Sequence, residues 1–98
     1  MEKFKDLIQA DKPVLVDFYA TWYEPCKAMH ITMNKLRDIV KDKARIEEID
    51  VNVYDGTALF YRILMVPTFI IFKKGEVLWR HSGIISEQEL QKAIEHFL

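Results

Sequence analysis

Cys26 and His30 are the residues of this sequence whose types and spacing could support covalent chemistry. A helix is predicted to begin near Pro25, so these two side chains share one helical face, with Cβ atoms roughly 5–6 Å apart. An imidazole at that distance can act as a base toward the thiol, and a helix N-terminus favours the thiolate. The pair therefore predicts a nucleophile beside its base, with first-turn amides as donors to an oxyanion.

A purely structural explanation competes with this one. Cys26 can be a small apolar core residue, and His30 can point to solvent or pair with a core carboxylate. Because the chain has one cysteine, it cannot form an internal disulfide, and its sequence does not imply an oxidising compartment.

Hydrophobic periodicity and turn signals predict the element order αβαβαββα. The expected segments are a helix that ends before 11–13, a strand at 14–20, a helix from 25 to about 42, a strand at 44–53, a short helix at 57–63, strands at 68–72 and 77–81, and a last helix after a capping box at 86–89. Crossover helices between parallel strands, followed by a hairpin, indicate one α/β domain over 1–98. Its mixed sheet should have about four strands, flanked by about four helices.

That order and three local sequences resemble the thioredoxin family. The segment VLVDFYA at 14–20 is similar to the family's central strand, with Asp17 as its buried aspartate. The segment WYEPCK at 22–27 stands where the family has WCGPCK, and 66–68 resembles the segment whose cis proline, here Pro67, faces the active site. The resemblance covers nearly the whole chain and implies a thioredoxin fold.

The resemblance breaks at the residues on which thioredoxin chemistry depends. Tyr23 replaces the first cysteine, Glu24 replaces the neighbouring glycine, and Ile31 stands in place of a kinking proline. Dithiol–disulfide exchange needs one thiolate to form the mixed disulfide and another thiol to resolve it. We therefore do not expect ordinary thioredoxin activity. The concentration of departures at one end suggests a site rebuilt on a scaffold, as an engineered protein would show.

The same resemblance places Glu48 where thioredoxins usually hold a lysine near the buried aspartate. With Asp17 close by, one carboxyl pKa should rise, or a cation such as His30 must lie between the two groups. Glu48 or Asp17 could then orient His30, which gives the nucleophile–base–orienter arrangement of a cysteine hydrolase. A Cys26-dependent esterase is the leading hypothesis. Zinc binding by the same four residues is less favoured, since no close-spaced ligand motif supports it.

A group of mostly aromatic and apolar residues should lie at or near the family's active-site end, which in thioredoxins docks extended substrate peptides. They are Trp22, Tyr23, Glu24, Phe60, Tyr61, Met65 and Pro67. A peptide groove and a cavity for a small-molecule ester are both compatible with them, and Phe60 and Met65 can equally be core residues. Two other functions stay open: a redox-inactive module that binds a peptide or protein, and a monothiol oxidoreductase resolved by glutathione.

Composition argues against several further classes. Fourteen Lys and Arg residues against fifteen Asp and Glu residues give a net charge of -1, which offers no broad footprint for nucleic acid or anionic membrane. The apolar runs are far shorter than the roughly 20 residues of a membrane span, and the charged N-terminus is unlike a signal peptide. We expect a cytosolic monomer that uses no cofactor.

Overall fold

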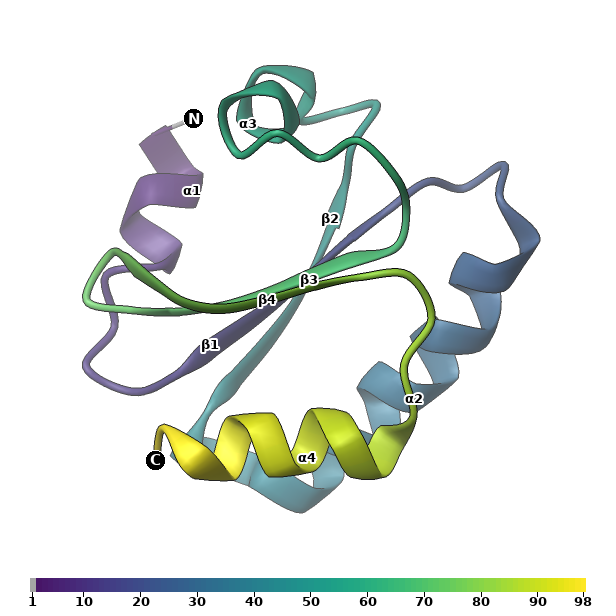
Figure 1. Cartoon of the computed structure of the whole chain (residues 1–98). Helices are drawn as coiled ribbons and strands as arrows, with labels where there is room; N and C mark the ends of the chain where they lie inside the picture. The colour runs from purple at the N-terminus through teal and green to yellow at the C-terminus, as the bar shows by residue number, and fades with distance from the viewer. Residues whose placement is uncertain (1) are drawn as a thin grey trace.

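The computed structural model describes the backbone of residues 2–98 and the side chains from residue 3 onward. In this part of the chain the elements are α1 (Glu2–Leu7), β1 (Val14–Tyr19), α2 (Glu24–Val40), the 3-10 helix η1 (Lys41–Lys43), β2 (Arg45–Asp50), α3 (Asp55–Phe60), β3 (Thr68–Lys73), β4 (Glu76–Ser82) and α4 (Glu87–His96). The strands form one sheet in the order β2-β1-β3-β4. The predicted mixed sheet with four helices is confirmed (Figure 1).

Strand pairing follows the chain connections. β1 and β2 are parallel because α2 crosses over between them, whereas β1 pairs antiparallel with β3, and β3 with β4. In the register of the parallel pair, Asp17 lies opposite Glu48. The topology therefore brings together the two carboxylates that the sequence analysis placed near one another.

The sheet separates two apolar clusters, with α2 and α4 on one face and α1 and α3 on the other (Figure 1). Leu15 packs in the cluster beneath α2 and α4, whereas Val14, Val16 and Phe18 pack in the opposite one. Because strand side chains alternate between faces, Asp17 is directed to the same face as Leu15. This alternation places a carboxyl group under the first turns of α2.

The largest differences from the predicted boundaries are at β2 and α3. β2 ends at Asp50 rather than at 53, since the Asp50 side chain accepts a hydrogen bond from the Asn52 amide (2.8 Å) and starts a turn. α3 begins and ends earlier than the predicted 57–63. Arg62, with φ 52, is in the left-handed region, which does not continue a right-handed helix. Residues 61–67 therefore form a loop that leads into β3.

Two local predictions are confirmed. Oγ of Ser86 accepts a hydrogen bond from the Glu89 amide at 3.1 Å, as expected for the N-cap of α4. The peptide bond between Val66 and Pro67 is cis.

Among residues 2–98, none of the helices has the length and apolar character that crossing a membrane requires.

Candidate functional site

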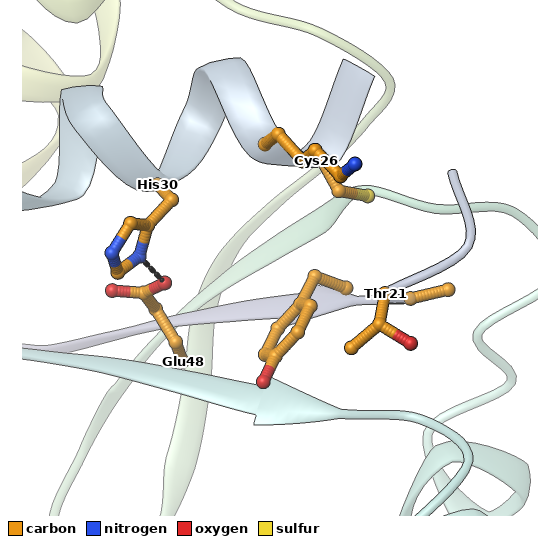
Figure 2. A pocket seen from close by; sticks show the side chains of 7 residues that line it. Thr21, Cys26, His30 and Glu48 are labelled. Atoms are coloured by element: carbon orange, nitrogen blue, oxygen red, sulfur yellow. Dashed lines mark hydrogen bonds and ion pairs between the residues drawn. The ribbon is translucent and has the colours of Figure 1, made fainter. Parts of the chain in front are cut away.

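Cys26 lies in the first turn of α2, where Pro25 occupies a position that needs no amide hydrogen bond. The side chain is 4% exposed and lines a cavity of about 290 Å³. The other lining residues are Tyr19, Ala20, Thr21, Lys27, His30 and Glu48 (Figure 2). Burial raises the pKa of the Cys26 thiol, a backbone hydrogen bond at Ala20 opposes the rise, and the charge of Asp17 adds to it. The site thus favours the neutral thiol over the thiolate.

His30 is engaged by a carboxylate. Its Nδ1 lies 2.5 Å from Oε2 of Glu48, and because an ionised carboxylate only accepts, Nδ1 carries the hydrogen. In Figure 2 the imidazole ring turns toward Glu48, and the Cys26 sulfur points in another direction. No hydrogen bond joins Cys26 to His30 within residues 2–98. The orienting contact of the predicted triad is present, but the contact between nucleophile and base is absent.

Glu48 is held by two basic side chains. Besides His30, Nη1 of Arg37 donates to Oε1 of Glu48 at 2.9 Å, and the same guanidinium donates to the Ile46 carbonyl. Sequence reasoning missed Arg37, although it lies seven residues after His30 and hence on the same face of α2. These contacts explain how β2 accommodates an acidic side chain where the family usually has a basic one.

Asp17 is the unpaired member of this group. Its side chain is 1% exposed, and Oδ1 has no hydrogen-bond partner in the described part of the chain. Burial, and then the charge of Glu48, raise its pKa from 3.8 to about 7, while His30 and Arg37 act in the opposite direction. The predicted rise of one carboxyl pKa is confirmed and falls on Asp17.

The same residues do not form a metal centre. Over residues 2–98, no three or more His, Cys, Asp or Glu side chains are placed to hold a metal ion together. Zinc binding by the Cys26 group is therefore not supported.

A second depression, of about 380 Å³, lies at the end of the molecule where α2 begins. It is lined by Trp22, Tyr23, Val51, Ile63, Leu64, Met65 and Val66. We call this depression the apolar groove. Leu64 is 93% exposed, Trp22 69% and Met65 53%, so the alternative that Met65 is a core residue is wrong. Pro67, which follows Val66 of the groove in sequence, is buried, and its carbonyl accepts a hydrogen bond from the Gly83 amide at 2.8 Å.

Phe60 and Tyr61 do not line the apolar groove. The Tyr61 ring packs against Phe4 and Phe72 at centroid distances of 5.7 and 5.3 Å, so it belongs to the cluster around α1. Phe60 is 69% exposed and is not a core residue either. The Phe60 ring meets the Tyr61 ring edge to face, with centroids 4.9 Å apart, on the outer side of that cluster. Glu24 is exposed at the start of α2 and forms an ion pair with Lys27 at 2.8 Å.

Comparison with known proteins decides the family. The family model described as thioredoxin matches residues 1–96. The chain belongs to the thioredoxin family. It is a thioredoxin-fold protein with a single cysteine, related to redox proteins.

Individual thioredoxins agree with this assignment. The chain is 42% identical to the chloroplastic thioredoxin Y1 of Arabidopsis thaliana over 99% of its own length, but it spans 57% of that relative. It is 36% identical to thioredoxin C-2 of Corynebacterium nephridii, with 92% of this chain and 83% of the relative covered. A mutant thioredoxin of Halobacterium salinarum superposes with a TM-score of 0.90 at 29% identity, over 99% of this chain and 84% of the other.

Burial of the Cys26 thiol predicts slow alkylation. In the folded protein, iodoacetamide should modify Cys26 at least about 100-fold more slowly than in the unfolded chain, because the reagent must wait for local opening. The measurement is a mass-spectrometric time course across pH, with the same chain in guanidinium chloride as the control. A rapid native reaction with a plateau well below pH ~8.5 would show an activated thiolate and contradict this assignment.

Proposed function

We propose that this thioredoxin-family chain is a binding module that docks an extended peptide in the apolar groove and performs no dithiol exchange. The observation that carries the proposal is the pairing of an exposed apolar groove with a buried, protonated thiol. The groove presents Trp22 and Met65 to solvent, whereas Cys26 is 4% exposed. A groove lined by exposed apolar side chains is characteristic of a docking site.

The backbone beside the groove offers a way to hold a peptide in register. In the described part of the chain, neither the N–H nor the C=O of Val66 takes part in a hydrogen bond. Because Val66 precedes a proline, its backbone is driven toward the extended region, and both groups then point to the same side. An extended peptide can pair with this residue and place alternate side chains into the groove.

The two thiol-dependent hypotheses have less support. An esterase needs an imidazole nitrogen of His30 beside the sulfur, but no hydrogen bond joins the two side chains in the described residues, and the pKa of the Cys26 thiol is raised. A monothiol oxidoreductase needs a reachable thiolate, and the exposed position at the start of α2 is Tyr23. We therefore do not propose either activity.

The curated plant relatives are about 1.7 times as long as this chain, which spans 57% of the first of them. Peptide binding is therefore proposed for this chain itself, and it is not carried over from the longer plant thioredoxins. The cytosolic location expected from the sequence stays a prediction, since that relative is named as chloroplastic.

A selection from a library of displayed linear peptides tests the proposal. We expect enriched peptides to contain a large apolar residue in a β-prone context. Trp22→Ala should weaken their binding at least about tenfold, since a well-packed aromatic anchor contributes a large part of binding energy. The Kd is measured by titration of a labelled peptide.

Leu59→Ala is the matched control, because Leu59 is 80% exposed on α3 but does not line the groove. Its affinity should equal that of the parent chain, and Cys26→Ala should also leave binding unchanged. Failure to enrich any peptide, or equal binding by Trp22→Ala, contradicts the proposal.

A further inference from the structure

The end of the molecule around the apolar groove exposes an unusual amount of apolar surface. We define the docking face as Trp22, Tyr23, Leu64, Met65 and Ile84, which are exposed by 69%, 38%, 93%, 53% and 62%. The first four line one groove. Ile84 follows Gly83, whose amide donates to the carbonyl of Pro67, the residue after Val66 of the groove. Exposed apolar side chains that gather in this way usually mark an interaction site.

This face combines a projection with a recess. Leu64 is almost fully exposed and stands at the edge of a depression of about 380 Å³ that it helps to line. A two-fold axis through such a surface places the projection of each copy over the recess of the other. The docking face is thus suited to contact a second copy of itself.

The backbone at Val66 has the same self-complementary character. In an antiparallel ladder, two directly opposed residues can exchange both of their N–H···O=C bonds across a local two-fold axis. Val66 has both groups unpaired within residues 2–98. It can therefore pair with Val66 of a second copy without any other change in the hydrogen bonding of the chain.

Charge and area are compatible with such a pair. Glu24, which follows Tyr23 of the docking face in sequence, forms an ion pair of 2.8 Å with Lys27, so the two charges offset each other and do not repel an identical copy. The five exposed side chains offer on the order of 100–200 Å² each. Both copies together would then bury roughly 1,000–2,000 Å², which reaches the range of specific interfaces.

We propose that two copies of this chain associate through the docking face, with Leu64 of each copy in the apolar groove of the other and Val66 paired with Val66. The inference uses the same groove as the proposed function but does not require peptide binding. A second copy and a peptide would compete for one face. The monomer expected from composition is then the form that predominates only at low concentration or with a bound peptide.

Sedimentation velocity over about 1–500 µM tests the association, because a dimer's population depends on protomer concentration. The parent chain should shift from monomer to dimer in this range. Leu64→Glu should abolish the shift, since it would place two carboxylates against apolar surface. Leu59→Glu makes the same chemical change on α3, outside the docking face, and should still dimerise.

Hydrogen exchange at the Val66 amide provides a second measurement. Protection of this amide should increase with concentration in the parent chain and in Leu59→Glu, and should stay constant in Leu64→Glu. A parent chain that stays monomeric at about 500 µM overturns the proposal. A dimer that persists in Leu64→Glu, that is lost in Leu59→Glu, or that forms without protection of Val66 assigns the contact to another face and also overturns it. Peptide binding by a monomer would leave the proposed function intact.

Discussion

Tyr23→Cys is expected to give this chain the activity of a dithiol disulfide reductase. Tyr23 is the N-cap residue of α2 and is 38% exposed, whereas Cys26 lies buried in the first turn. A thiol at position 23 would be accessible, and the helix N-terminus would favour its thiolate. It could attack a substrate disulfide, and Cys26 could then resolve the mixed disulfide.

The measurement is reduction of a disulfide-containing substrate by dithiothreitol. The Tyr23→Cys variant should raise the rate on the order of tenfold or more above dithiothreitol alone, while the parent chain should not raise it. Tyr23→Ser is the matched control, because it has the same small side chain without the thiol. Combining Tyr23→Cys with Cys26→Ala should trap the mixed disulfide. A folded but inactive Tyr23→Cys variant would show that Glu24, Ile31 or Glu48 also blocks the chemistry.

Asp17→Asn should stabilise the protein at alkaline pH, and the effect should shrink in acid. The pKa of Asp17 is raised from 3.8 to about 7 in the folded state, so the folded chain binds more protons than the unfolded chain between those values. Stability therefore falls as pH rises through this window. A pKa shift of this size corresponds to on the order of 4 kcal/mol. The buried Asp17 carboxylate lowers the free energy of unfolding by this amount above neutral pH.

The free energy of unfolding should be measured with guanidinium chloride at about pH 4 and about pH 8.5. The gain from Asp17→Asn should be larger at the higher pH by on the order of 2–4 kcal/mol. Asp38→Asn is the control, because it makes the same chemical change at an exposed position on α2. Equal effects of Asp17→Asn at both pH values would mean that Asp17 is not the group that titrates.

These predictions separate two consequences of the replaced site. The first tests whether loss of one thiol is sufficient to explain the loss of dithiol chemistry. The second tests whether the buried Asp17 carboxylate still destabilises the fold, although Glu48 is bonded to His30 and paired with Arg37. A chain that gains activity from Tyr23→Cys would retain a thioredoxin framework that is competent apart from the missing thiol.

Local sequence determined the architecture of this protein and the chemistry that it lacks. Helical and strand periods, the capping box at Ser86 and the loop around Pro67 predicted the order of elements, because each depends on residues close together in the chain. The replacement of a cysteine by Tyr23 is equally plain from the sequence, and it excludes the dithiol cycle without any coordinates. Only the ends of the elements differ from the predicted bounds, because side chains such as Asp50 compete there with regular backbone hydrogen bonds.

Tertiary structure alone decided what the remaining groups do. Helical spacing placed Cys26 and His30 on one face, but Glu48, 18 residues away on β2, binds the imidazole. Tyr61 packs half-buried against the core while Leu64 is exposed to water, although neither position stands out in the periodic pattern. Side-chain partners and burial arise from the packing of elements that are distant in sequence. Local patterns therefore predict which side chains can meet, and packing selects those that do.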